Sequence, residues 1–124
     1  MSSERHDRGM EVRRQVLGDD HVDRAVADTT DLDAQFQRWI TENVWGDLWA
    51  RPGLERRDRS LITIAILASA GHEELSLHLR AAKNTGTTPE EIAEVFLHVA
   101  VYAGVPAANQ AFKTMKTIYE EETE

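Results

Sequence analysis

The amino-acid sequence predicts an all-α protein, and three features of its second half carry this prediction. The apolar run Leu61–Ala70 is too long and too rich in alanine for a buried strand. In the stretch that follows, apolar residues recur at the three- and four-residue spacing of an amphipathic helix. The segment Thr88–Glu91 supplies an N-cap, a proline at N1 and a glutamate at N3, which together are typical of a helix start.

The second half should contain four helices. Leu61–Ala70 has two polar residues, so we expect it to be buried on all sides. The next helix should extend from about Glu73 to Thr85. The helix after it should begin directly after its N-cap Thr88 and end at Gly104. Pro106 should open the last helix, whose acidic end, residues 120–124, is expected to fray.

The first half predicts shorter helices and one loop. Residues 4–17 and 20–27 have the pattern of two modest amphipathic helices. Thr30, with Asp33 three residues later, should cap a third helix that ends at Gly46. Its apolar stripe is Leu32, Phe36, Trp39 and Ile40. Residues 45–54 should form an ordered loop, which gives about six to seven helices in a single domain, residues 1–124.

Composition limits the classes of function. Fourteen Lys and Arg against 22 Asp and Glu give a net charge of −8, which weighs against binding to nucleic acid or to anionic membranes. A few local arginines can still make a pocket suitable for an anionic small molecule. Cysteine is absent, so disulfides and cysteine-based catalysis are excluded. The sequence lacks a signal-type apolar segment, so we expect a cytoplasmic protein, and its small size favours self-association.

Two histidines are candidate catalytic residues. Helical spacing places His78 on the core-facing stripe of its helix, with Glu74 one turn before it, where a carboxylate can fix the tautomer of the imidazole. His98 lies inside the apolar stretch Val95–Tyr102 and is expected to be buried, with Glu94 as its polar neighbour on the helix. For both histidines, a purely structural role in the core is the alternative.

Three arginines border the helices on either side of His78. Arg57, Arg59 and Arg80 suit a carboxylate clamp because guanidinium binds carboxylates in a bidentate manner, although a solvated surface is the alternative for each. His72 precedes Glu74 and His78 without the spacing of a zinc motif, so no metal is expected. The sequence has no phosphate-binding glycine loop and no nucleophile-elbow serine, so no nucleotide cofactor is expected.

Several ordered blocks resemble the carboxymuconolactone decarboxylase family. These blocks are Arg13–Gly18, Trp45–Leu54, Arg59–Ala65, Leu77–Gly86, Glu91-Ile92 and Leu97–Asn109, so the resemblance covers nearly the whole chain. It implies a helical fold shared with alkylhydroperoxidase D and a homo-oligomer, either a hexamer or a trimer of dimers. Peroxide-reducing members of that superfamily carry a Cys-x-x-Cys motif, which would fall on Gly71 and Glu74. Thiol peroxidase activity is therefore excluded here.

The resemblance also implies an activity, the cofactor-free decarboxylation of 4-carboxymuconolactone to β-ketoadipate enol-lactone in protocatechuate breakdown. The ring of this lactone accepts the electrons itself, so the protein must hold an anion, stabilise an oxyanion and deliver one proton. The hypothesis assigns the proton to His78 oriented by Glu74, the oxyanion or the ring to His98, the carboxylates to Arg57, Arg59 and Arg80, and the pocket wall to Trp45 and Trp49. Another small acid or lactone as substrate, or a non-enzymatic helical oligomer, are the alternatives.

Overall fold

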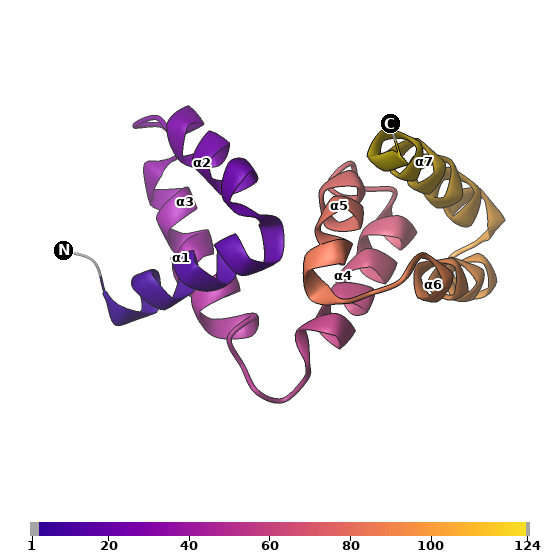
Figure 1. The fold of residues 1–124 in the computed structure, drawn as a ribbon, viewed down its shortest axis with the longest axis horizontal. Helices are drawn as coiled ribbons and strands as arrows, with labels where there is room; N and C mark the ends of the chain where they lie inside the picture. The colour runs from indigo at the N-terminus through magenta and orange to yellow at the C-terminus, as the bar shows by residue number, and fades with distance from the viewer. Residues whose placement is uncertain (1–2, 124) are drawn as a thin grey trace. The chain divides into compact units, whose positions relative to one another are not determined.

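The computed structural model describes residues 3–123, which form seven α-helices and one π-helix (Figure 1). The all-α prediction is therefore confirmed. The chain divides into two compact units, residues 1–55 and residues 56–124, and each is described by itself. Among the described helices, none is long and apolar enough to cross a membrane.

Unit 1 contains α1 (Glu4–Leu17), α2 (Asp19–Asp28), α3 (Ala34–Ile40) and the π-helix η1 (Thr41–Leu48). Helix α1 begins where the hydroxyl of Ser3 accepts a hydrogen bond from the backbone N–H of His6 at 3.0 Å. It ends at Gly18, whose φ of +91° favours glycine, and α2 follows directly. The two predicted helices of this region are confirmed to within about one residue at each end.

The predicted end of the third helix at Gly46 is wrong, because the chain continues through Leu48 as η1. At its end the backbone N–H of Trp49 donates to the carbonyl of Val44 at 2.9 Å, which is the five-residue spacing of a π-helix. This wider turn carries both Gly46 and Trp45 inside a helix. The expected loop over residues 45–54 is consequently restricted to the turns and loop that follow Leu48.

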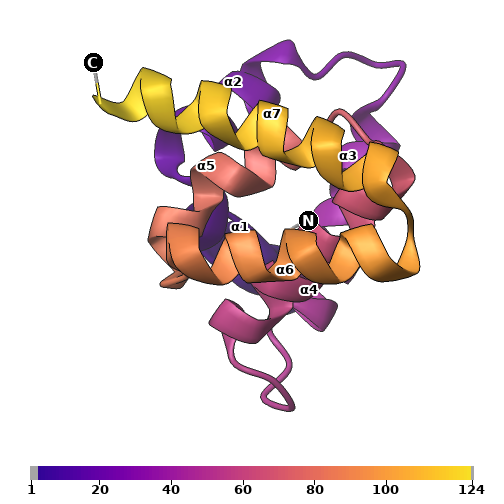
Figure 2. The ribbon, with the colours of Figure 1, turned by 90° about the vertical axis from the view of Figure 1, so that its right-hand side faces the viewer.

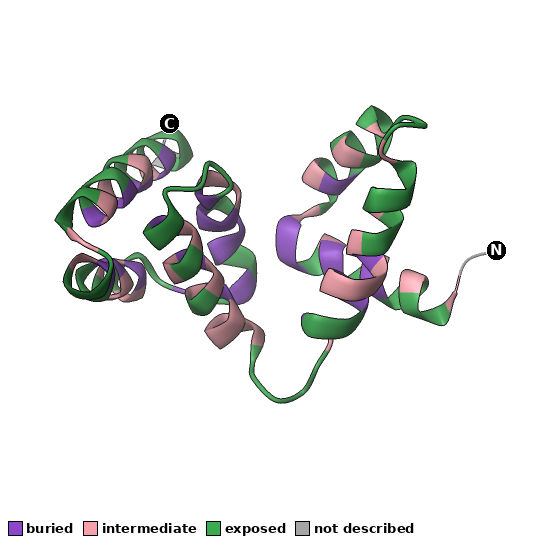
Figure 3. Cartoon of the chain, turned by 180° about the vertical axis from the view of Figure 1, so that it is seen from behind, coloured by how far each residue is buried: buried purple, intermediate pink, exposed green. Residues whose placement is uncertain are grey.

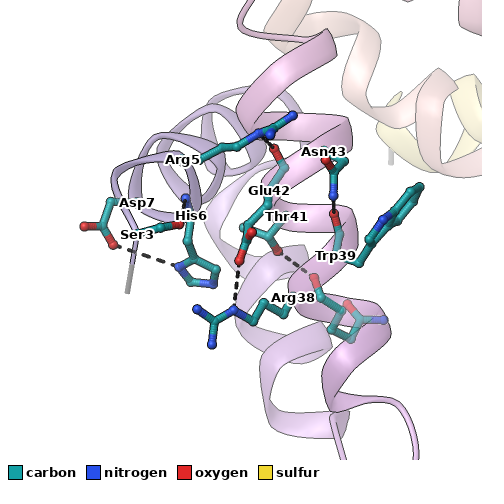
Figure 4. Close-up of polar contacts among 10 residues, drawn as sticks. Ser3, Arg5, His6, Asp7, Arg38, Trp39, Thr41, Glu42 and Asn43 are labelled. Atoms are coloured by element: carbon teal, nitrogen blue, oxygen red, sulfur yellow. Dashed lines mark hydrogen bonds and ion pairs between the residues drawn. The ribbon is translucent and has the colours of Figure 1, made fainter. Parts of the chain in front are cut away.

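Helix α1 and η1 meet through their backbones. A β-carbon on Gly9 would lie 1.9 Å from the carbonyl oxygen of Thr41, and one on Gly46 would lie 2.3 Å from the carbonyl oxygen of Arg5. Side chains reinforce the contact: the Nε of Arg5 donates to the carbonyl of Glu42 at 3.0 Å (Figure 4). Glycine at both positions is therefore what permits this approach.

The apolar stripe predicted for the third helix is not buried. Leu32 precedes the helix and is 98% exposed, and Phe36 and Trp39 on α3 are both more than half exposed. The predicted cap at Thr30 is also wrong, because Asp33 is the residue before α3, which is a short segment of seven residues. Within unit 1, the regular spacing of apolar residues on α3 therefore does not mark a face that packs against the core.

Unit 2 contains α4 (Arg56–Ala70), α5 (Leu75–Thr85), α6 (Pro89–Tyr102) and α7 (Val105–Thr123). Helices α6 and α7 lie side by side in opposite directions (Figure 2), and both pack against α4. All four helices contribute to one core, formed by Ile64, Ala68, Leu75, Leu79, Ala82, Ile92, Phe96, Val99, Ala108, Ala111, Met115 and Ile118. The rings of Phe96 and Phe112 meet edge to face, with centroids 5.3 Å apart.

The predicted starts and ends of helices in unit 2 hold with three exceptions, the first of which is α4, because it begins at Arg56 rather than at Leu61. The capping box of α6 is complete, since the hydroxyl of Thr88 accepts the N–H of Glu91 at 3.2 Å and a carboxylate oxygen of Glu91 accepts the N–H of Thr88 at 2.9 Å. Gly86 ends α5 in the left-handed conformation. Helix α5 begins at Leu75, and the predicted frayed end is helical through Thr123, while residue 124 lies outside the described residues.

The prediction that the apolar helix is buried on all sides is wrong. In α4 the residues buried at helical spacing are Ser60, Ile64 and Ala68, whereas Ile62 and Ile66 on the opposite side are exposed. Figure 3 likewise shows buried positions as short bands within helices rather than along any whole helix. Because α5, α6 and α7 cover one side of α4, its second apolar side is left without cover in unit 2.

The close contact of α1 with η1 makes Gly9→Ala strongly destabilising. Alanine is the better helix former, but its methyl group would meet the backbone oxygen of Thr41, which cannot rotate away as a side chain can. We expect the free energy of unfolding to fall by about 2 kcal/mol or more, as for other overpacked sites. Gly53→Ala is the matched control because open space surrounds Gly53. Equal urea midpoints for the two variants would contradict the contact.

Candidate active site

A groove of about 620 Å³ lies between α4 and α6 in unit 2. The residues that line it are Leu61, Ile62, Ala65, Ser69, Glu91, Glu94, Val95, His98, Val99 and Tyr102. Its walls are mostly apolar, and its ionisable groups come from one side of α6. A mostly apolar cavity with a few polar groups on one wall is the usual form of a small-molecule site.

His98 faces this groove, so the prediction that it is buried is wrong. The core-facing residues of α6 are Ile92, Phe96 and Val99, and His98 lies just outside that face although its neighbours in sequence are apolar. Its ring stacks on Tyr102, with centroids 4.9 Å apart and an angle of 23° between the planes. The imidazole is therefore held by a stacked ring and can present a nitrogen to a ligand in the groove.

Arg57 lies at the same end of the groove as Glu91, with which it forms an ion pair. Its second partner is the neighbouring Asp58, at 3.2 Å from Nη1 to Oδ1. The other carboxylate oxygen of Glu91 is held by the capping box of α6, so Glu91 joins the first turns of α4 and α6. A ligand carboxylate that binds Arg57 must compete with two carboxylates that already contact it.

His78 occupies the core-facing stripe of α5, as predicted, and is 7% exposed. Its backbone N–H donates to the carbonyl of Glu74 at 3.3 Å. Glu74 itself is the exposed N-cap of α5, and its N–H donates to Nδ1 of His72 at 3.2 Å. The residues that line the groove come from α4 and α6, so His78 and His98 lie in different surroundings within unit 2.

The remaining candidates lie apart from the groove. Arg80 is exposed on α5 and pairs with Glu121 of α7 at 2.8 Å. Arg59 is partly exposed on α4, and its carbonyl accepts a hydrogen bond from the hydroxyl of Thr63 at 2.8 Å. Within unit 2, the structure thus places His98 on the groove and links Arg57 to it through the ion pair with Glu91, while the roles of Arg57, Arg59, Arg80 and His78 in a shared site stay predictions.

Trp45 and Trp49 both belong to unit 1. They are buried and stack on one another, with ring centroids 5.2 Å apart and an angle of 29° between the planes. Trp45 lies within η1 and Trp49 is the residue that follows it, so their four-residue separation places both rings on one side of the helix end. That these rings form the wall of a substrate pocket stays a prediction.

Arg13 was not among the candidate residues predicted from the sequence, and in the structure it is a buried arginine. Its side chain is 7% exposed, at the contact between α1 and η1. Burial without a carboxylate partner lowers the pKa of Arg13 below its ordinary value. One sequence signal marks this position: Gly9, one helical turn earlier, lies on the same face of α1.

The arrangement offers no ready-made metal centre. Among residues 3–123, no group of three or more His, Asp or Glu side chains lies close enough together to hold a metal ion. The groups available for chemistry are imidazoles, guanidinium groups and carboxylates. Such groups bind anions, stabilise oxyanions and transfer protons.

Fold and groove together define a small all-α protein whose apolar groove carries an imidazole, a phenol and two carboxylates. Comparison with known proteins makes the class specific, because the sequence profile of the Carboxymuconolactone decarboxylase family matches residues 34–117. The chain belongs to this family. The resemblance found in its sequence blocks is thereby confirmed.

Named relatives agree with this assignment. The chain is 44% identical to a 4-carboxymuconolactone decarboxylase of Acinetobacter baylyi over 95% of its length and 89% of that protein. A nitrosuccinic acid decarboxylase of Metarhizium robertsii is 45% identical over 90% of this chain and 80% of its own. A 4-carboxymuconolactone decarboxylase sequence of Pseudomonas putida is 50% identical over 36% of this chain and 92% of that sequence.

Proposed function

We propose that this protein is a cofactor-free decarboxylase that converts 4-carboxymuconolactone to β-ketoadipate enol-lactone in the cytoplasm. The observation that carries the proposal is the 44% identity to the Acinetobacter enzyme over 95% of the chain. The histidines and arginines of unit 2 support it, because they match what the reaction requires of a protein. Absence of cysteine disfavours a thiol peroxidase.

The reaction needs no external electron sink. When the carbon–carbon bond to the departing carboxylate breaks, CO₂ leaves and the electron pair moves through the ring double bond to the lactone carbonyl oxygen. The resulting furanolate-like oxyanion is stabilised by hydrogen-bond donors. A proton then adds to the ring carbon next to the carbonyl, which restores the C=O bond and gives the enol-lactone.

We assign these tasks to residues of this chain. His78, oriented by Glu74, supplies the proton, and its burial keeps water from competing for the proton-transfer position. His98 donates a hydrogen bond to the oxyanion, which its exposure in the groove supports. Arg57 holds a substrate carboxylate, together with Arg59 and Arg80.

Nitrosuccinic acid is the second candidate substrate, on the strength of the 45% identity to the fungal enzyme. Its chemistry is parallel: the nitro group takes the electron pair that CO₂ leaves behind, and a proton then adds to carbon. Both candidates are small dicarboxylic acids that lose one carboxylate and retain the other. The site must therefore bind a carboxylate that does not react.

We also propose that the protein is a homo-oligomer, as the family resemblance implies. Support comes from the outer side of α6 and the start of α7, where Leu97, Val101 and Val105 are all more than half exposed. Ile66 on α4 is a further exposed apolar residue of unit 2. Exposed apolar residues that are contiguous in this way are typical of a protein–protein contact.

The direct test of the function is CO₂ release by the purified protein from each candidate substrate. We expect turnover of 4-carboxymuconolactone with a kcat/KM at least about tenfold above that for nitrosuccinate. The reverse order would assign the protein to the second candidate, and release from neither substrate would refute both.

The role of each histidine can be tested by a conservative variant. His78→Gln should lower kcat by about 100-fold or more, the usual contribution of a general acid, with little change in KM. His98→Gln should also lower kcat, since it removes an oxyanion donor. Circular dichroism and the oligomeric state serve as controls. Full turnover by folded His78→Gln would remove this residue from the mechanism.

Arg57→Ala should raise KM for the lactone by about tenfold or more, because a charge-assisted pair to the substrate is lost. Arg24→Ala is the matched control, since it removes one exposed arginine of α2 in unit 1. Steady-state kinetics at constant ionic strength provide the measurement. A KM equal to that of the control variant would count against the assignment of Arg57.

Val101→Lys should shift the protein to smaller species in light scattering, because it places a charge on the proposed subunit contact. Val101 is 77% exposed in the single chain, so the substitution should leave the fold of the subunit intact. Thr117→Lys, on the exposed part of α7, is the control and should not change the oligomeric state. A wild-type protein that is monomeric at micromolar concentration would contradict the proposal.

A further inference from the structure

Arg13 is a buried cation whose hydrogen-bond partners are neutral. Its Nη1 donates to the hydroxyl of Thr41 at 3.4 Å, and its Nη2 donates to the side-chain oxygen of Gln37 at 3.3 Å. Both distances are at the long end of the range for such bonds. Within residues 3–123, the buried Nε atom has no hydrogen-bond partner. A buried guanidinium without a counter-ion is unfavourable, so an anion should complete this arrangement.

The neighbouring residue shows how the chain treats an ordinary arginine. Arg14 is partly exposed, and it pairs with Asp19 at 3.0 Å and with Asp23 at 2.8 Å. These two carboxylates, Asp23 first, raise the pKa of Arg14 above its ordinary value, whereas burial lowers the pKa of Arg13. Both carboxylates thus pair with the partly exposed Arg14, whose charge water already solvates, and neither pairs with the buried Arg13.

The surroundings of Arg13 are rigid. Gly9, one turn earlier on α1, brings the helix within backbone contact of Thr41, the first residue of η1. The hydroxyl of Thr41 donates its own hydrogen to the carbonyl of Gln37 at 2.9 Å, which leaves its lone pairs for Arg13. π-Helical turns are rare and occur frequently at functional sites. The guanidinium is therefore fixed in place before any anion arrives, which lowers the entropic cost of binding one.

We propose that Arg13 is a carboxylate-binding residue of unit 1, and that its counter-ion is a carboxylate of a small dicarboxylic acid. The identity of the substrate as a small dicarboxylate rests on the proposed function. A carboxylate forms shorter and stronger bonds to guanidinium than a hydroxyl or an amide does, so it can replace the long bonds to Thr41 and Gln37. Arg57 is less suited to this task because two carboxylates already contact it.

The proposal predicts two effects of opposite sign for Arg13→Met, a variant of similar length without charge. In the absence of ligand, the unfolding temperature should stay the same or rise, because an uncompensated buried charge is removed. Succinate, a dicarboxylate that cannot be decarboxylated in this way, should raise the unfolding temperature of the wild type in a concentration-dependent manner. Arg13→Met should weaken succinate binding, measured by calorimetry, by about tenfold or more.

Arg14→Met is the matched control, since it makes the same change in charge and side chain one position along α1. It should lose some stability with its two ion pairs, yet bind succinate as the wild type does. Arg13→Lys keeps the charge without the planar fork and should recover part of the affinity. A residue with a merely structural role would not produce this combination of an unchanged or raised unfolding temperature with lost affinity.

Three results would overturn the proposal. The first is a wild type that does not respond to succinate. The second is an Arg13→Met protein that unfolds at lower temperature and still binds succinate, which would make Arg13 structural. The third is an Arg13→Met protein that binds succinate normally but changes its oligomeric state, which would mean that a carboxylate of another copy is the counter-ion.

Failure of this proposal can be told apart from failure of the proposed function. Succinate binding needs no turnover, so a protein that binds succinate through Arg13 but releases no CO₂ would refute the function alone. Conversely, CO₂ release by a protein whose Arg13→Met variant has unchanged KM and unchanged succinate affinity would refute the role of Arg13 alone.

Discussion

The burial of Phe96 determines which side of α6 is available for function. This ring is fully buried in the core of unit 2 and contacts Phe112 edge to face. Helical geometry then places His98, two residues later, outside the core and next to the groove with α4. The capping box at Thr88 fixes the other end of the helix, where Glu91 meets Arg57. The packing of Phe96 and the capping box at Thr88 thus position the ionisable groups that α6 contributes to the groove.

Local signals in the sequence predicted most of the fold. The cap at Thr88 and the apolar stripe that contains His78 depend on neighbouring residues, so they could be read directly. Ile66 and His98 were misjudged because an apolar neighbourhood does not tell which side of a helix meets the core. For Arg13 the one local signal is Gly9 on the same face of α1, and it does not reveal the burial of the arginine, which depends on contact with η1, 28 residues further along the chain.

The arginines of this protein divide by what surrounds them. Arg57 and Arg80 contact carboxylates of the chain itself, at the groove and at α7 respectively. Arg13 has neutral partners and is held in a rigid contact. An anion can therefore bind Arg13 without displacing a carboxylate of the chain, whereas at Arg57 or Arg80 it must compete with one.

In the proposed mechanism, side chains of this protein deliver the proton that replaces CO₂. The most direct measurement is turnover of 4-carboxymuconolactone in D₂O, followed by NMR of the enol-lactone at short times against a protein-free control. We expect one deuterium per CO₂, on one face of the carbon next to the carbonyl. Equal deuterium on both faces from the earliest times would mean that solvent, rather than the protein, protonates the ring.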